Sequence, residues 1–247
     1  VACRGVPGSW NNMTVGVGMH GALPDDWRDE LRSICAWYEG AGVEPRLEVA
    51  PFADTGLLKH CEAERFVVRN FDNVLYRVLR AGERAVAAQT PDPRIRVRLV
   101  NKDDDAEVRL FSRIAMTGFH PPGHEFAESD YEIWARVVKH PRTRSLLASV
   151  ETREGLVPAG AGSIELHNEI ACLFGLSTVH EYRRLGIQQS LIAARLNLAI
   201  DHGVKVATIG SRPGAGTERN VRRMGFQTAY TKVILARPGP GLVPARG

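Results

Sequence analysis

The sequence predicts a mixed α/β (α+β) fold, and three observations support this prediction. Apolar residues make up 44% and charged residues 24% of the 247 residues, which is the ordinary composition of a globular protein. Alternating apolar residues, typical of strands, occur between segments whose apolar residues recur with helical spacing. In the second half of the chain several strands come in succession, and helices and strands then alternate, an order typical of α+β and mixed α/β proteins.

The elements of the second half follow from local patterns. Three aspartates at 103–105 suit the positively charged start of a helix, and the next helix ends before Pro141. Gly203 stands where the longest helix should stop. The expected strands are 96–100, 146–151, 161–168, 170–179 and 204–211, with one or two more in 226–236, and the expected helices are 103–117, 126–139, 186–202 and 214–224.

Composition and charge argue against several classes of protein. The four cysteines lie far apart in the sequence, so neither a disulfide framework nor a zinc knuckle is expected, and a cytoplasmic location is the simplest one. No apolar run reaches the roughly 18 residues that a membrane helix needs, so no membrane partner is expected. The net charge of +4 is spread along the chain, which argues against nucleic acid but allows an anionic small ligand.

The chain also predicts a division into domains and an internal repeat. Two prolines and small residues at 88–94 suit a linker, and the Pro/Gly-rich end is expected to fray. At one constant offset in the numbering, Leu31 falls opposite Leu191 and Phe66 opposite Phe226, so the first half repeats the pattern of the second. The expected parts are therefore a half-domain at 1–90, a complete domain at 94–237 and a flexible tail at 238–247.

The most informative stretch is Leu176–Leu191. A strand ends there, a short loop carries Arg183, Arg184 and Gly186, and a helix begins at once. The start of a helix has unpaired backbone N–H groups and about half a unit of positive charge, so it binds phosphate without a particular side chain. A glycine lets the backbone approach the anion closely, and the arginines add charge and bidentate hydrogen bonding.

This stretch resembles the acyl-CoA-binding motif of the GNAT N-acyltransferase superfamily. That motif is Arg or Gln, two residues, Gly, one residue, then Gly or Ala, and 183–188 fits it at every place except the last, Gln188. The resemblance covers about 94–238 and includes Met224-Gly225-Phe226. It implies a mostly antiparallel sheet flanked by helices, and the weaker first half resembles the degenerate copy of a tandem GNAT protein.

The resemblance also implies how acyl-CoA would be held. The backbone of the strand end would bind the pantetheine arm, the loop would wrap the pyrophosphate, and a bulge would open the sheet for the thioester, while Asn220 on the following short helix is a further candidate. The implied cofactor-binding residues are Leu176, Ser177, Thr178, Arg183, Arg184, Leu185, Gly186, Ile187, Gln188, Gln189 and Asn220.

The acid and base of the resembled family are missing from their places. Where many relatives have a Tyr and an Asn, this chain has Val221 and Gly214, and a strand Glu is replaced by Ile209 or Gly210. The catalytic residues are therefore unknown. The weak candidates are Glu165 and His167, which share a strand face that otherwise reads as a solvated hairpin, and Tyr230, which otherwise reads as a half-buried strand residue.

Two further patterns have ordinary explanations beside functional ones. His120 and His124 are four residues apart, but the intervening Pro-Pro-Gly forbids a helix, so a loop that could contact substrate is expected and no metal site. Gly16, Gly18 and Gly21 match the dinucleotide fingerprint, yet the next helix starts only after Pro24, too late for that motif. At the offset that pairs Leu31 with Leu191, Asp25 and Asp26 correspond to Leu185 and Gly186 of the loop expected to bind phosphate (183–189). Acidic groups at these places would repel an anion.

The sequence thus leads to an expected function and to rivals. The expectation is an acyl-CoA-dependent N-acyltransferase, with acetyl-CoA as donor and an amine of a small molecule or peptide as acceptor, acting as a monomer or homodimer; an oxygen acceptor stays open. The first rival is a catalytically inactive CoA-binding sensor or regulatory module. A nicotinamide- or flavin-dependent oxidoreductase resting on Gly16–Gly21 is the second, and a nucleic-acid-binding module is the third.

Overall fold

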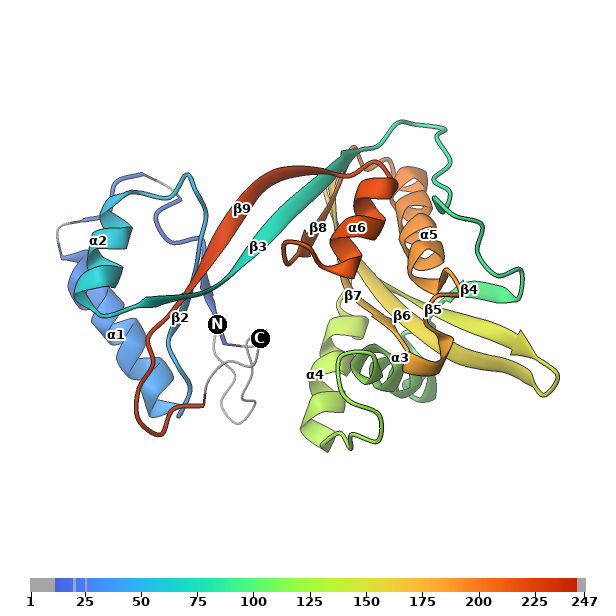
Figure 1. The fold of residues 1–247 in the computed structure, drawn as a ribbon, viewed down its shortest axis with the longest axis horizontal. Coiled ribbons are helices and arrows are strands. Elements are labelled where there is room, and N and C mark those ends of the chain that lie inside the picture. Colours follow the sequence, from blue (N-terminus) through green and yellow to red (C-terminus); the bar gives the residue numbers. More distant parts are fainter. Residues whose placement is uncertain (1–11, 20, 25, 244–247) are drawn as a thin grey trace. The chain divides into compact units, whose positions relative to one another are not determined.

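A computed structural model describes residues 12–19, 21–24 and 26–243 of the chain. The chain forms two compact units, the first made of Val1–Val74 with Ala229–Gly247 and the second of Leu75–Thr228. Two long strands, β3 (Val67–Val78) and β9 (Gln227–Ala236), pass from one unit into the other (Figure 1). No helix in the described part of the chain is both long and apolar enough to cross a membrane.

The second unit is built on a mixed, mostly antiparallel sheet. In this unit the strands lie in the order β8-β7-β6-β5-β4; neighbours from β4 to β7 pair antiparallel, and β7 pairs parallel with β8. The predicted fold class is confirmed. The elements of this unit are β4 (Ile95–Leu99), α3 (Asp105–Thr117), α4 (Glu128–Lys139), β5 (Thr143–Thr152), β6 (Gly155–His167), β7 (Ile170–Thr178), a 3₁₀ turn (His180–Tyr182), α5 (Ile187–Asp201), β8 (Val206–Ser211) and α6 (Gly216–Arg223).

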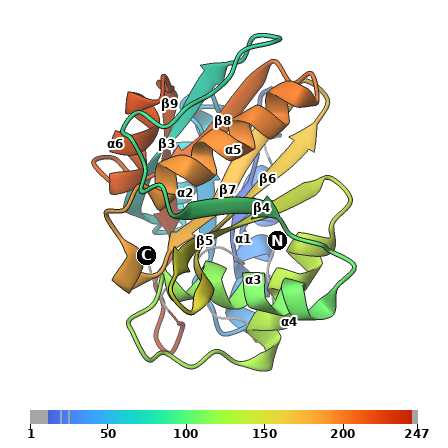
Figure 2. The same ribbon diagram turned by 90° about the vertical axis from the view of Figure 1, so that its right-hand side faces the viewer.

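Helices cover both faces of this sheet. Consecutive strand residues point to opposite faces, and the neighbours Leu146 and Leu147 of β5 belong to different core clusters. Leu146 packs with residues of α5, whereas Leu147 packs with residues of α3 and α4. Figure 2 shows α5 on one side of the strands and α3 and α4 on the other.

Most element boundaries lie within a few residues of those expected. Helix α3 starts at Asp105 because the side chain of Asp104 caps it, accepting hydrogen bonds from the N–H groups of Ala106 and Glu107 at 2.9 and 3.2 Å. Helix α4 starts two residues later than expected, at Glu128. The last segment forms one strand, β9, rather than two.

The first unit repeats the order of elements that surround the loop between β7 and α5 in the second unit. It contains β1 (Thr14–Val15), α1 (Trp27–Gly40), β2 (Arg46–Val49) and α2 (Gly56–Ala63), followed by β3. Helices α1 and α5 begin at positions 27 and 187, β2 and β8 at 46 and 206, α2 and α6 at 56 and 216, and β3 and β9 at 67 and 227. The predicted repeat is therefore present, at the offset that pairs Leu31 with Leu191.

Equivalent residues also fill equivalent places in the two cores. Leu31 and Leu191 are both fully buried, and Val49 and Ile209 are both core residues of their units. Phe66 and Phe226 begin the same turn, because each donates its backbone N–H to the residue five positions earlier, at 2.9 and 3.1 Å. The first copy is nevertheless reduced, since β1 is two residues long where β7 has nine.

The compact units do not follow the expected division at 88–94 or the expected tail. Segment 88–94 belongs to the second unit, where it contacts the loop between β7 and α5. Residues 238–243 are held in the first unit, where Val243 donates its N–H to the Gly42 carbonyl at 2.9 Å and accepts one from Glu44 at 3.3 Å. Residues 244–247 lie outside the described part of the chain.

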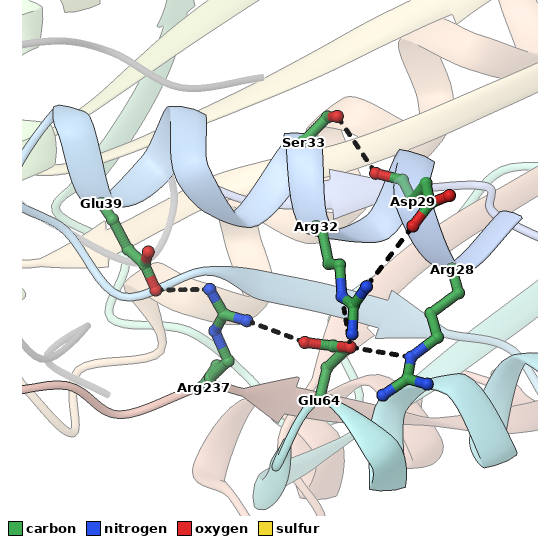
Figure 3. A network of polar contacts seen from close by, with 7 residues as sticks. All are labelled: Arg28, Asp29, Arg32, Ser33, Glu39, Glu64 and Arg237. Carbon is green, nitrogen blue, oxygen red and sulfur yellow. Dashed lines mark hydrogen bonds and ion pairs between the residues drawn. The ribbon is translucent and has the colours of Figure 1, made fainter.

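An ionic network ties together α1, the end of α2 and the end of β9 within the first unit (Figure 3). Glu64 accepts hydrogen bonds from Nε of Arg28 at 2.9 Å and of Arg32 at 2.8 Å, and pairs with Arg237 at 3.3 Å. Arg237 also pairs with Glu39 at 2.5 Å. Burial raises the pKa of Glu64, but the hydrogen bonds from Arg28 and Arg32 outweigh it and lower the pKa below its usual value.

We expect Glu64→Gln to lower the free energy of unfolding by about 1–2 kcal/mol at pH 7, because the Glu64 side chain is mostly buried and hydrogen-bonded to charged groups. A lowered folded-state pKa means that the carboxylate stabilises the fold above the unfolded pKa of about 4.5 and loses this effect as the pH falls below it. Urea unfolding of both proteins between pH 7 and pH 3 checks this. A difference that grows as the pH falls would contradict it.

Candidate functional site

The loop between β7 and α5 contains two residues with a left-handed backbone. After the 3₁₀ turn, Arg184 adopts φ +67° and Gly186 adopts φ +92° directly before the first residue of α5. Gly186 suits this position because a left-handed backbone favours glycine.

Six consecutive backbone donors in this loop are unused. Among the residues that the structure describes, no hydrogen bond was found that uses the N–H of Arg184, Leu185, Gly186, Ile187, Gln188 or Gln189. The first N–H of this helix start with a protein partner is that of Ser190, which binds the Gly186 carbonyl at 3.0 Å. The loop therefore presents unpaired donors at the positive end of a helix, an arrangement that suits a phosphate or pyrophosphate.

The two arginines of the loop differ in their contacts. Arg183 donates from Nη2 to the carbonyl of Gly118 at 3.1 Å, so it braces the loop against the segment after α3. That segment is also held by Ser177, whose hydroxyl accepts from the Gly118 N–H at 3.1 Å and donates to the Ile114 carbonyl at 3.0 Å. Arg184 is exposed and is the loop arginine more available to an anion.

Gln188, the departure from the resembled motif, is turned toward α6. Its Nε2 donates to the Thr217 hydroxyl at 3.1 Å, and its Oε1 accepts from the Asn220 amide. The side chain is therefore engaged by the neighbouring helix and leaves its own backbone N–H unused. Asn220, the further residue expected to contact CoA, joins α5 to α6 through Gln188 and, at 3.4 Å, Gln189.

The segment expected to be a linker forms one wall of the loop. Gln89 donates its N–H to Oε1 of Gln189 at 3.0 Å, and Asp92 donates its N–H to the Leu185 carbonyl at 2.9 Å. Pro91 lies so close that a Cβ on Gly186 would be 2.9 Å from its Cα. The prolines at 88–94 thus belong to a packed turn beside the loop. The composition of this segment fits a packed turn and a linker equally well.

The strand leading into the loop carries the bulge that the resemblance implies. Ala161 pairs with Ser177 but Ser163 pairs with Phe174, so Gly175 and Leu176 of β7 stand opposite the single residue Gly162 of β6. The parallel pairing of β7 with β8 ends at Leu173 and Ile209. The backbone of Leu176–Thr178 therefore continues beyond the pairing of β7 with β8.

The candidate bases lie away from this bulge and are paired. At about 3.3 Å per strand residue, Glu165 and His167 stand about 10 and 17 Å along β6 from Gly162. Arg142 approaches Oε1 of Glu165 to 3.0 Å and Nδ1 of His167 to 2.9 Å. A carboxylate and an imidazole that share one arginine are poorly placed to take a proton at the bulge.

The other candidates have local roles. Tyr230 belongs to the first unit, where its ring packs edge-on against Phe52 with centroids 4.8 Å apart. His120 and His124 lie in a loop, as expected, with rings stacked at 4.4 Å. His120 also supplies the carbonyl that Nε2 of His180 meets at 2.9 Å, so this loop reaches the turn before the phosphate loop. Within the described residues, no group of three or more His, Cys, Asp or Glu could hold a metal ion.

The start of α1 differs from the start of α5 in the hydrogen bonds of its first amides. At the start of α1, Trp27 donates its N–H to the Pro24 carbonyl at 3.0 Å and Asp29 donates to the Asp26 carbonyl at 2.9 Å. Asp25 lies outside the described residues. In the glycine-rich segment, the Gly18 carbonyl accepts from the Asp54 N–H at 2.9 Å, so that segment packs on the turn after β2 and does not form the start of α1.

Comparison with solved structures identifies the fold. A GCN5-related N-acetyltransferase from Kribbella flavida matches over 88% of this chain and 77% of its own, with a TM-score of 0.64 and 18% identity. This chain has the GNAT fold. A tandem GNAT protein from the clavulanic acid biosynthesis pathway matches over 87% of this chain and 69% of its own, with a TM-score of 0.62 and 13% identity.

A third GNAT structure, from Sphaerobacter thermophilus, has a TM-score of 0.60 and 18% identity; the match covers 83% of this chain and 64% of that one. No protein-family model matches the sequence, and no curated protein matches it either. The structural comparison thus detects the GNAT fold at sequence identities too low for the sequence comparisons to detect it. These similarities concern the fold alone.

Proposed function

We propose that the second unit binds acyl-CoA, with acetyl-CoA as the preferred donor, and transfers the acyl group to an amine. The single observation that carries this proposal is the run of unused N–H groups from Arg184 to Gln189 at the start of α5. A pyrophosphate carries negatively charged oxygens that such donors match, and hydrogen bonds to charged acceptors are the stronger ones. The bulge beside the loop supports a thioester, rather than a nucleotide alone, as the ligand.

The proposed reaction is a direct transfer. The amine lone pair attacks the thioester carbonyl, the C–N bond forms, and the C–S bond breaks to leave the CoA thiolate, which takes up the proton lost by the amine. A backbone N–H of the bulged strand stabilises the oxyanion, a contribution that does not depend on side-chain identity. Because Glu165 and His167 share Arg142 away from the bulge, we assign no side chain as the base.

The second candidate is a CoA-binding sensor or regulatory module without catalysis. Its support is chemical: Val221, Gly214 and Ile209 cannot ionise, and they occupy the places where related enzymes carry polar or acidic groups. This candidate shares the loop and differs only in turnover.

Calorimetric titration with acetyl-CoA tests the binding, with a nicotinamide dinucleotide as the control ligand. We expect one site per chain, because α1 carries Asp26 where α5 is preceded by Gly186, and an acidic group at that place repels an anion. No heat with acetyl-CoA, or preference for the dinucleotide, would overturn the proposal. Thiol release from acetyl-CoA in the presence of a panel of amines then separates the transferase from the sensor.

A further inference from the structure

A fully buried arginine stands behind the bulge. Arg195 of α5 has no exposed surface, and its Nη1 donates to the carbonyls of Ser163 at 2.9 Å and Phe174 at 3.2 Å, while Nε donates to the Leu191 carbonyl at 3.0 Å. Ser163 and Phe174 form the last regular pair of β6 and β7 before the bulge. The guanidinium therefore binds both strands at the point where their pairing shifts.

The backbone makes room for this side chain. A Cβ on Gly162, the residue that faces the bulge, would lie 3.1 Å from the guanidinium carbon of Arg195. Carbonyls near a bulge lose regular ladder partners, and a buried polar group without a partner costs free energy. Arg195 supplies donors at this irregular place, so the extra residue of β7 can stay in the sheet.

Stability alone does not explain this arginine. Its Nη2 is buried and has no hydrogen-bond partner among the described residues. Burial lowers its pKa to about 9, which still leaves it charged at neutral pH. Replacing buried charged groups by apolar side chains is often neutral or stabilising. In the reduced first copy, Cys35 occupies the equivalent place, at the offset that pairs Leu31 with Leu191, and β1 is only two residues long.

We infer that Arg195 is a positioning residue for the acyl donor, holding the β7 bulge in the shape that admits the thioester arm. It acts through the carbonyl of Phe174, whose peptide group also carries the N–H of Gly175 within the bulge. The positively charged guanidinium that donates to this carbonyl keeps the peptide group oriented. It also polarises the N–H of Gly175, which makes that N–H a stronger hydrogen-bond donor. This inference rests on the proposed function for the ligand, but the effect on the bulge is independent of it.

The test compares Arg195→Met and Arg195→Lys with Ile200→Val, a conservative change in the same helix and the same core. The ligands are acetyl-CoA and ADP, which has the pyrophosphate but no thioester arm. We expect Arg195→Met to raise the Kd for acetyl-CoA by about tenfold, roughly the worth of one hydrogen bond from a charged group, and to change the Kd for ADP less than about twofold. Arg195→Lys should recover part of the loss, and Ile200→Val should change neither Kd.

Amide hydrogen exchange of segments 160–164 and 172–178 reports on the bulge without any ligand. We expect faster exchange there in Arg195→Met, and unchanged exchange in the loop 184–189. Equal loss of acetyl-CoA and ADP affinity, or unchanged exchange in both bulge segments, would overturn the inference. If the wild-type protein binds no acetyl-CoA, the proposed function fails, and the exchange arm still decides whether Arg195 holds the bulge. If Arg195→Met does not fold, Arg195→Lys is measured in its place.

Discussion

In the Gly186→Asp variant, CoA binding is expected to weaken by at least about 100-fold, or about 2.7 kcal/mol. Gly186 has φ +92°, which strains any side chain, and a Cβ would lie 2.9 Å from the Cα of Pro91. The loop must therefore shift, and several N–H groups lose their common direction at once. The aspartate also adds a negative charge beside the anion.

The matched control is Gly203→Asp, at the other end of the same helix. Gly203 has a similar φ of +73° and open space around its Cβ position, so it carries the same backbone strain and the same charge without touching the loop. Calorimetry with CoA and thermal unfolding are measured for both. CoA affinity in Gly186→Asp that equals that of Gly203→Asp would show that the phosphate site lies elsewhere.

Leu191→Ala is expected to lower the free energy of unfolding by about 3–5 kcal/mol, the range typical of a fully buried leucine whose cavity cannot collapse. Leu191 is fully buried in the core between α5 and the sheet of the second unit. Urea unfolding measures the effect. Leu156→Ala in the same unit is the control, because Leu156 is 58% exposed and its truncation should cost less than about 0.5 kcal/mol.

The equivalent variant of the first copy, Leu31→Ala, separates the two units. Leu31 is also fully buried, but in the core that includes Cys35 and Leu57. We expect a comparable loss of stability in the first unit with CoA affinity retained by the folded second unit. A loss below about 1 kcal/mol for Leu191→Ala would contradict the packing of α5 described above.

The position of the loop before α5 was predictable because it depends on residues that are adjacent in the sequence. A strand end, a glycine and the first turn of a helix are adjacent in the sequence, and the unpaired donors of a helix start do not depend on distant residues. The repeat was predictable for a similar reason: the same periodicity, found twice at a constant offset, places Leu31 and Leu191 on the buried side of their helices. The fold class followed from the order of such segments.

Arg195 shows what local patterns conceal. It stands four residues after Leu191, on the apolar side of the helix, and that spacing is the sign that could have marked it as buried. Its role depends on the carbonyls of Ser163 and Phe174, which come from two other strands. Such a role is invisible until the sheet is assembled.

The sequence by itself determined the α/β class, the elements, the repeat and the glycine loop before α5, because each depends on residues close together in the chain. Tertiary structure alone decided that the Gln188 side chain binds Thr217 and that segment 88–94 packs beside the loop. It also decided that Arg142 binds both Glu165 and His167. It also decided that the compact units divide within β3 and β9. The physical reason is the same throughout: these features are contacts between residues far apart in sequence, and neither composition nor periodicity encodes which distant partners will meet.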